Sequence, residues 1–174
     1  LAKETAIIEP SQKNVMIAIR LDKTSTQLSL FYHGKLIASE WLEIGSGQWI
    51  RSLSEFFRLP EDVATRLLYY NCDLKEKEYS THPVYLWAVK EQSKTCSQAE
   101  IMEIVYPQFD DWRKQLIRMC EPIIEKRTTE LLITGEGSLI EGIDTFIQEA
   151  FDSETRLYVP ETIGARDPGL TVAL

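Results

Sequence analysis

The residues best suited to chemistry form a glycine-rich turn, Thr134-Gly135-Glu136-Gly137-Ser138, between a predicted strand at Leu131–Ile133 and a predicted helix at Leu139–Phe151. A turn in this position can serve one of two purposes. Its backbone N–H groups can approach a phosphate at the N-terminus of the helix, or its glycines can let the helix and the sheet pack closely. The sequence alone leaves both interpretations open.

Other side chains with catalytic potential lack a suitable partner. His33 lies in a predicted hairpin turn and His82 lies beside Pro83, and neither has a fixed acid or thiol nearby in the pattern. Both are predicted to be solvated loop residues. Asp110 and Asp111 are adjacent on a predicted helix, where neighbouring residues do not face each other, so a solvated helix face is expected rather than a carboxylate pair.

Composition indicates a folded protein with an apolar core, since 44% of the 174 residues are hydrophobic. The formal net charge of −8 repels nucleic-acid phosphates and anionic membrane surfaces, so neither partner is expected for these residues. Cys72, Cys96 and Cys120 are odd in number and widely spaced, which predicts free thiols in a reducing compartment. A cytoplasmic location is expected.

Three short apolar segments begin the chain and are separated by polar or His-Gly turns: Asn14–Ile19, Gln27–Phe31 and Lys35–Trp41. They predict a three-stranded meander. A helix is expected from Gly45-Ser46-Gly47 to just before Pro60, because apolar residues then recur at helical spacing. A second helix should follow and end near Asn71.

The middle of the chain is the least regular. Polar runs at Asp73–Ser80 and Lys90–Thr95 flank a strand-like segment at Val84–Val89, and we expect both runs at one exposed end of the molecule. Ser97 and Glu100 form a capping-box pattern that predicts the start of a long helix. Apolar residues keep helical spacing beyond Pro107, so we expect a kink at this proline and a further break near Pro122.

The last third of the sequence predicts strand, turn, helix and strand, the last strand at Arg156–Val159. Together with the meander, this order indicates a mixed α/β layer of about five strands. Within it we expect Asn14–Ile19 to lie next to Leu131–Ile133. The sequence begins at Leu1, and Gly169–Leu174 looks like the start of a helix, so we expect both ends to be cuts in a longer protein.

These elements and residues resemble the second lobe of the bacterial cell-division protein FtsA. The turn Thr134–Leu139 with Gly142 is similar to the adenosine loop of actin-like proteins, T-G-G-G-(S/A)-x-(L/I)-x-G, and Val159-Pro160 with Asp167-Pro168 resembles the segment that closes it. Residues that match the inserted subdomain of FtsA favour this branch: Glu61-Asp62, Tyr70, Cys72 and the Ser97–Pro107 helix.

The resemblance implies an α/β fold, an actin-like ATPase (ribonuclease H-like) subdomain with a mixed sheet. Residues 1–58 and 128–174 would form this sheet subdomain, called IIA in the family. Residues 59–127 would form a smaller inserted α/β subdomain, called IIB. A first lobe would precede Leu1.

The resemblance also implies a nucleotide site, and the matching residues indicate that it is degenerate. Arg20 stands where the family has the aspartate that orders the metal, and Asp22-Lys23-Thr24 stands in place of glycines. Thr65 or Arg66 with Leu67 replaces the Glu and Lys that hold the ribose, and Glu136 replaces the middle glycine of the adenosine loop. No cofactor is expected, although Mg-ATP stays an alternative.

Two functions remain open. The first is an FtsA-like scaffold for cell division or envelope assembly, which does not hydrolyse ATP and whose inserted subdomain binds the acidic-hydrophobic tail of FtsZ or another division protein. The second is an actin-like ATP switch, with a pilus-assembly adaptor as a further alternative. Self-association through subdomain tips is also expected from the family, as is membrane tethering through parts outside this sequence.

The resemblance places the candidate partner contacts on the helix around Pro107, at Gln108, Trp112, Arg113 and Lys114. The tryptophans Trp41, Trp49, Trp87 and Trp112 are expected to be mostly core anchors. Among them, Trp87 or Trp112 is the best candidate for an exposed contact surface.

Overall fold

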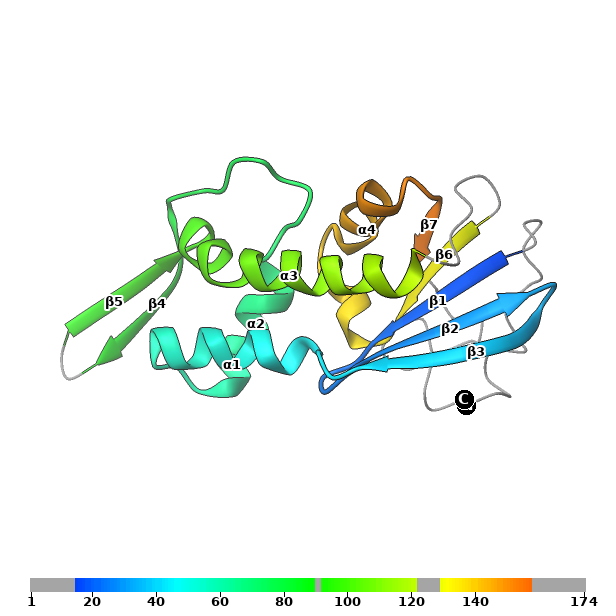
Figure 1. Cartoon of the computed structure of the whole chain (residues 1–174). Coiled ribbons are helices and arrows are strands. Elements are labelled where there is room, and N and C mark those ends of the chain that lie inside the picture. Colours follow the sequence, from blue (N-terminus) through cyan, green and yellow to red (C-terminus); the bar gives the residue numbers. More distant parts are fainter. Residues whose placement is uncertain (1–14, 90–91, 122–128, 158–174) are drawn as a thin grey trace, which may run out of the picture.

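A computed structural model describes residues 15–89, 92–121 and 129–157. Strands and helices follow one another in a mixed order within these ranges (Figure 1). Their bounds are β1 (Val15–Leu21), β2 (Thr26–Tyr32), β3 (Lys35–Leu42), α1 (Ser46–Phe57), α2 (Glu61–Asn71), β4 (Pro83–Val89), β5 (Gln92–Ser97), α3 (Gln98–Cys120), β6 (Thr129–Thr134), the 3-10 helix η2 (Glu136–Leu139), α4 (Ile143–Phe151) and β7 (Thr155–Leu157).

The main sheet has five strands in the order β3-β2-β1-β6-β7. Strands β1, β2 and β3 form the antiparallel meander, while β1 pairs in parallel with β6, and β6 with β7. The predicted neighbourhood of Asn14–Ile19 and Leu131–Ile133 is therefore confirmed for the described residues, since Ile17 lies opposite Leu131. Parallel pairing places the carboxyl ends of β1 and β6 at the same edge of the sheet.

Alternation along the strands builds two apolar clusters. Ile17 and Ile19 of β1 belong to the large core shared with the helices, whereas Met16 and Ala18 belong to a small cluster with Phe31 and Leu132. The two sets point to opposite faces of the sheet because successive side chains of a strand alternate. Figure 1 shows the helices extending beyond the sheet, with the β4–β5 hairpin at the opposite end of the molecule.

Local signals explain most element boundaries. The β2–β3 hairpin turns through His33 and Gly34, both with positive φ, as two-residue hairpin loops require. The Ser97–Glu100 capping box is present at the start of α3, where the Ser97 hydroxyl accepts from the Glu100 backbone N–H. Both features agree with the sequence prediction.

Helix α3 continues through Pro107 to Cys120, as the helical spacing beyond that proline predicted, and the kink at Pro107 stays a prediction. Two other expectations for the middle and last parts of the chain were wrong. Strand β5 occupies most of the predicted polar loop Lys90–Thr95, because pairing with β4 supplies backbone hydrogen bonds that an all-polar segment does not signal. Helix α4 begins at Ile143, since η2 and Gly142, at φ +79°, precede it.

The polar run Asp73–Ser80 does not lie at the hairpin end of the molecule as expected. Its beginning is fixed near η2, where the Leu74 backbone N–H donates to the Glu141 carbonyl at 2.9 Å and Lys75 Nζ pairs with Glu141 at 2.6 Å. Its end reaches the start of α3, because the Ala99 N–H donates to the Ser80 carbonyl. The run therefore connects two distant parts of the fold. The division at residues 58/59 and 127/128 stays a prediction.

Candidate functional site

The candidate site lies where two turns meet at the carboxyl ends of β1 and β6. The first turn follows Leu21 and is closed by a 3.0 Å hydrogen bond from the Asp22 N–H to the Ser25 carbonyl. The second begins at Gly135, directly after β6. Because Arg20 is the register partner of Thr134, the two turns are neighbours. Ligands of open α/β sheets usually bind at such an edge.

The second turn packs tightly on the end of β1. A Cβ atom added at Gly135 would lie 2.6 Å from the Leu21 carbonyl oxygen, and one at Gly137 would lie 2.1 Å from Leu21 Cδ2. Gly135 also has φ +87°, which side chains disfavour. Close packing of strand and turn, the second of the two purposes raised by the sequence, is thus sufficient to require both glycines.

Helix α1 packs against the first turn from another side. The Ser46 N–H donates to the Asp22 carbonyl at 3.0 Å and the Gly47 N–H donates to the Lys23 carbonyl at 2.8 Å. Cβ atoms at Gly45 and Gly47 would come within 2.5 and 2.7 Å of these carbonyl oxygens. Two N–H groups at this helix N-terminus, a place that often binds anions, are therefore already used within the protein.

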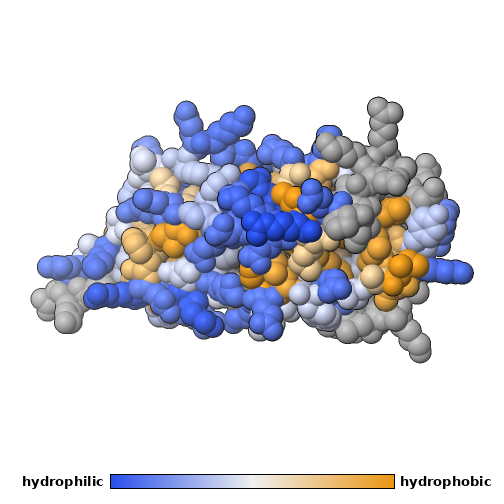
Figure 2. All heavy atoms as spheres, viewed as in Figure 1, coloured by the Kyte–Doolittle hydropathy of each residue, from blue (hydrophilic) through white to orange (hydrophobic). Residues whose placement is uncertain are grey.

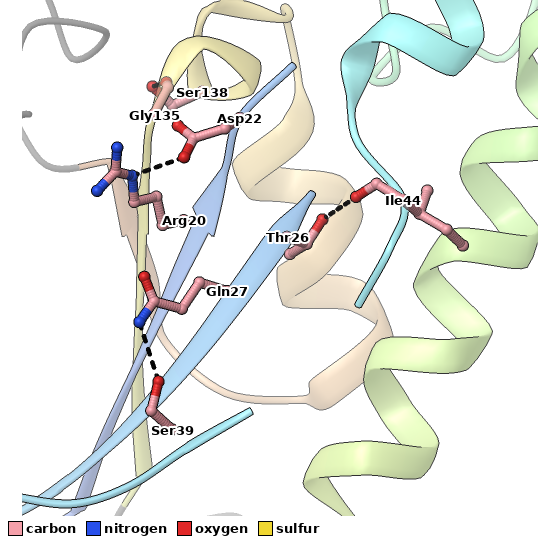
Figure 3. A network of polar contacts seen from close by, with 8 residues as sticks. All are labelled: Arg20, Asp22, Thr26, Gln27, Ser39, Ile44, Gly135 and Ser138. Carbon is pink, nitrogen blue, oxygen red and sulfur yellow. Dashed lines mark hydrogen bonds and ion pairs between the residues drawn. The ribbon is translucent and has the colours of Figure 1, made fainter. Parts of the chain in front are cut away.

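An ion pair occupies the position where the resemblance places the metal-ordering acid. Arg20 Nε lies 2.9 Å from Asp22 Oδ2, and Asp22 lies beside Gly135 of the second turn (Figure 3). A Cβ at Gly135 would be 3.0 Å from Asp22 Oδ1. The side chains of Arg20 and Asp22 are thus engaged with each other at the edge where bare backbone would be needed to hold a phosphate.

A second ion pair joins the first turn to the start of α2. Lys23 Nζ lies 2.6 Å from Glu61 Oε1, and both side chains are exposed. The hydrogen bond raises the pKa of Lys23 and lowers that of Glu61, and the exposed Glu136 carboxylate adds to the effect on Lys23. Glu61 is also favourably placed at the positive end of the α2 dipole. One positive charge, on Lys23, and two negative charges, on Glu61 and Glu136, therefore border the site.

The residues matched to the ribose contacts are used within the fold. Leu67 is buried in the core, Thr65 Oγ1 donates to the Glu61 carbonyl at 2.7 Å, and Arg66 pairs loosely with Asp62. Besides Glu61, Tyr69 of α2 reaches the site region, where its hydroxyl donates to Ser46 Oγ at 3.1 Å. Burial raises the pKa of Tyr69. Sequence reasoning missed this contact because it joins two helices.

The five residues of the predicted nucleotide loop lie together, but in different environments. Thr134 ends β6, and Glu136 is exposed at the start of η2. Gly135, Gly137 and Ser138 are buried. The Ser138 hydroxyl donates to the Gly135 carbonyl at 2.7 Å and closes the turn on itself. Among the five loop residues, Glu136 is therefore the one that presents its side chain to solvent.

The predicted partner contacts on α3 do not form one surface. Trp112 is 0% exposed, and its indole N–H donates to Thr26 Oγ1 at 2.9 Å, so the expectation that Trp112 contacts a partner was wrong. Gln108 donates to the Ile104 carbonyl and accepts from Ser52. Both side chains are used within the fold because α3 lies between α1 and α4, so this part of its surface faces inward.

Arg113 and Lys114 are the charged members of this set. The Arg113 guanidinium lies 4.2 Å from the centre of the Phe146 ring and bonds to Asp110. Lys114 is exposed and its ammonium lies 2.6 Å from Asp110 Oδ2, while the two bases together lower the pKa of Asp110. Of these two bases Lys114 is the exposed one, so a partner contact by this set would depend mainly on its charge, which is paired with Asp110.

Metal clusters and membrane-spanning helices are both absent from the described residues. Within residues 15–89, 92–121 and 129–157, no group of three or more His, Cys, Asp or Glu side chains is arranged to hold a metal ion. None of the helices in the described part of the chain is both long and apolar enough to cross a membrane.

Neither a protein-family model nor a curated protein matches the sequence. Solved structures do match the fold. They include MreB5 of Spiroplasma citri bound to AMPPNP, with a TM-score of 0.75 and 17% identity over 99% of this chain and 55% of that one. A PilM-PilN type IV pilus biogenesis complex matches with a TM-score of 0.70 and 14% identity, over 99% of this chain and 49% of that one. EutJ of Carboxydothermus hydrogenoformans, an ethanolamine utilization protein, matches with a TM-score of 0.62 and 15% identity, over 96% of this chain and 49% of that one.

The chain spans about half the length of each of these structures. At identities of this size the likeness concerns the fold alone. The mixed five-stranded sheet and its covering helices therefore give this chain the α/β fold of the actin-like ATPases.

Proposed function

We propose that this chain is a lobe of an FtsA-like scaffold protein that binds protein partners and does not hydrolyse ATP. The observation that carries the proposal is the turn after β1. Its Asp22 side chain pairs with Arg20, its Lys23 side chain pairs with Glu61, and both of their carbonyls accept hydrogen bonds from α1. A phosphate loop needs free N–H groups and small residues at this place.

Electrostatics supports the same conclusion. The exposed carboxylate of Glu136 stands where the resemblance places a glycine beside a polyanionic ligand, and like charges repel. Each charge-assisted contact to a ligand is worth about 1.5–3 kcal/mol. Loss of the metal-ordering acid, the bare backbone and the ribose contacts would weaken binding by roughly three to six orders of magnitude.

Calorimetric titration with Mg-ATP tests this proposal on the complete encoded protein that contains this chain. We expect no saturable binding at micromolar nucleotide. A matched variant that combines Arg20→Asp, Asp22→Gly, Lys23→Gly and Glu136→Gly should gain measurable affinity. Low-micromolar binding by the natural protein, with phosphate release that stops when Arg20 or Glu136 is replaced, would show that the proposal is wrong.

The partner that we propose from the resemblance is an acidic-hydrophobic peptide of the FtsZ-tail type. The exposed positive charges on this part of α3 are Lys114 and Arg118, since Arg113 is stacked on Phe146. Fluorescence anisotropy of such a peptide should show binding that weakens with Lys114→Glu. The control is Arg66→Glu, which changes an equally exposed base on α2. Equal effects of both variants would mean that net charge, not a site on α3, attracts the peptide.

The alternatives are an ATP-dependent switch and a pilus-assembly adaptor. The similarity to MreB5, which was solved with AMPPNP, favours the switch, and the similarity to the PilM-PilN complex favours the adaptor. The nucleotide titration separates the switch from the scaffold. In both the scaffold and the adaptor we propose a cytoplasmic protein that works at the inner face of the membrane through parts outside this sequence.

A further inference from the structure

A row of aromatic rings joins the end of α1 to the β4–β5 hairpin. The ring centre of Phe56 lies 5.1 Å from that of Phe57, in an edge-on contact. Phe57 in turn lies 5.9 Å from Trp87, also edge-on. On the hairpin, Trp87 and Tyr85 are stacked with their centres 6.0 Å apart. These are arrangements that aromatic pairs favour, so the row holds its rings in fixed positions.

The aromatic row passes from the core to the surface. Phe57 is 7% exposed, whereas Phe56 is 67% exposed. Tyr85 and Trp87 are half-buried. Figure 2 shows apolar surface towards the hairpin end of the molecule. Exposed aromatic side chains that are held in place by buried ones suit an interface, because they offer a large contact area at a low cost in conformational entropy.

Two unpaired bases border the aromatic row. Arg58 directly follows Phe57, and Lys94 is the register partner of Trp87, so Lys94 and Trp87 stand on the same face of the hairpin. Both bases are exposed. Within the described part of the chain neither of them forms an ion pair, whereas Lys114 of α3 is paired with Asp110. Their charges are therefore available to a partner.

We propose that this surface, made of the aromatic row with Arg58 and Lys94, binds an acidic peptide segment of another protein that carries an aromatic or large aliphatic residue. That residue would pack against Phe56 and Trp87, and carboxylates on either side of it would pair with the two bases. Aromatic anchors supply most of the affinity at such contacts, while charge pairs fix the orientation. The inference rests on the proposed function, because it takes the same class of partner, but it assigns the contact to residues outside α3.

Charge distinguishes this surface from the other exposed apolar surface, which lies on β3. There Ile37 and Trp41 are exposed, but Glu40 lies between them and Lys35 is the only base of the strand. The strand therefore carries one acid and one base. At the aromatic row the acid of the last turn of α1 is Glu55, and it stands against two bases. An acidic partner is favoured there even though the whole chain has a net charge of −8.

Fluorescence anisotropy with the complete encoded protein tests the anchor. The probe is a short fluorescein-labelled peptide with aspartates on both sides of a central Phe-Leu pair. Phe56→Ser should weaken binding by about tenfold or more, as truncation of an interface anchor does. Tyr70→Ser is the matched control, because Tyr70 is 81% exposed on α2 and lies outside the aromatic row, and it should change the affinity by less than about twofold. Thermal unfolding of each variant checks that the fold is kept.

Charge variants test the two bases. Lys94→Glu should weaken binding several-fold, and Glu55→Lys should strengthen it, because each changes the charge beside the aromatic row. Lys35→Glu is the control for net charge, since Lys35 is exposed on β3, at the opposite end of the molecule from the hairpin (Figure 1). With asparagines in place of the aspartates of the peptide, the natural protein and the Lys94→Glu variant should bind equally weakly.

Each comparison has a result that would overturn the inference. Equal losses for Phe56→Ser and Tyr70→Ser would do so, as would equal losses for Lys94→Glu and Lys35→Glu. Binding that is weakened by Lys114→Glu but not by Phe56→Ser would also overturn it, and would leave the proposed function standing with its contact on α3. No binding of the peptide would overturn both this inference and the proposed partner, while the nucleotide titration would still test the scaffold.

Discussion

The turns that follow β1 and β6 lie side by side at one edge of the sheet, yet they are built from different residues. The turn after β6 keeps Gly135 and Gly137, while the turn after β1 carries the side chains of Asp22 and Lys23. The glycines of the former are required by contact with Leu21. A glycine pattern typical of nucleotide loops can therefore be required by packing alone.

The largest expected effect tests why the turn after β6 keeps its glycines. Gly135→Ala combines a positive φ with a Cβ only 2.6 Å from a backbone oxygen. It should lower the free energy of unfolding by about 3 kcal/mol or more in urea denaturation. Gly34→Ala is the control, because Gly34 has φ +74° but nothing within 4 Å of the added atom, and it should cost about 1 kcal/mol. Equal losses would contradict the packing explanation.

The next largest effect concerns the hydrogen bonds of Thr26, the first residue of β2 after this turn. Thr26 Oγ1 donates to the Ile44 carbonyl at 2.6 Å (Figure 3) and accepts from the buried Trp112 indole N–H at 2.9 Å. Thr26→Val leaves both groups buried without partners and should cost about 2 kcal/mol. Thr65→Val removes a hydroxyl bonded only within its own helix and should change stability by less than about 0.5 kcal/mol. Similar losses of stability in the two variants would contradict the structural role of the Thr26 hydrogen bonds.

A smaller effect is expected at Tyr69. Tyr69→Phe removes the hydrogen bond to Ser46 and should cost about 1 kcal/mol. Burial raises the pKa of Tyr69, so the unfolded chain releases this proton first, and stability falls as the pH rises above the usual tyrosine value of about 10. The variant should show a shallower loss at alkaline pH. Tyr70→Phe, at an exposed residue, should leave the alkaline slope unchanged.

The smallest effect is expected for the exposed Lys23–Glu61 pair. A double-mutant cycle with Lys23→Met and Glu61→Gln should give a weak coupling in thermal unfolding that disappears at about 1 M salt, where the Debye length is about 3 Å. The pKa of Glu61 is lowered, so its contribution is present above the usual glutamate pKa and is lost as the pH falls through the lower folded value. Coupling that survives high salt would indicate a buried contact instead.

Much of the fold could be predicted because its signals are local. Alternation in the first three strands, the Ser97–Glu100 cap and the glycine turn before α4 each report on neighbouring residues in the chain. Strand β5 could not be predicted in this way, because it exists through pairing with β4.

The sequence named residues of the candidate site but not their arrangement. From the residue types at Arg20, Asp22 and Glu136 we predicted that the metal and phosphate contacts are missing, and this stays a prediction. The ion pair of Lys23 with Glu61 and the bond of Tyr69 to Ser46 join residues far apart in sequence, and no local pattern signals them. The sequence also could not decide between packing and phosphate binding as the reason for Gly135.

Trp41 and Trp112 show which features the sequence determines locally and which depend on the tertiary structure. The sequence by itself determined that Trp41 lies on a strand and Trp112 on a helix, since periodicity depends only on neighbouring residues. Which of them is exposed was decided by the tertiary structure. Trp112 is enclosed because α1 and α4 cover its helix, whereas Trp41 is exposed because β3 is the last strand of its sheet and no described element covers it.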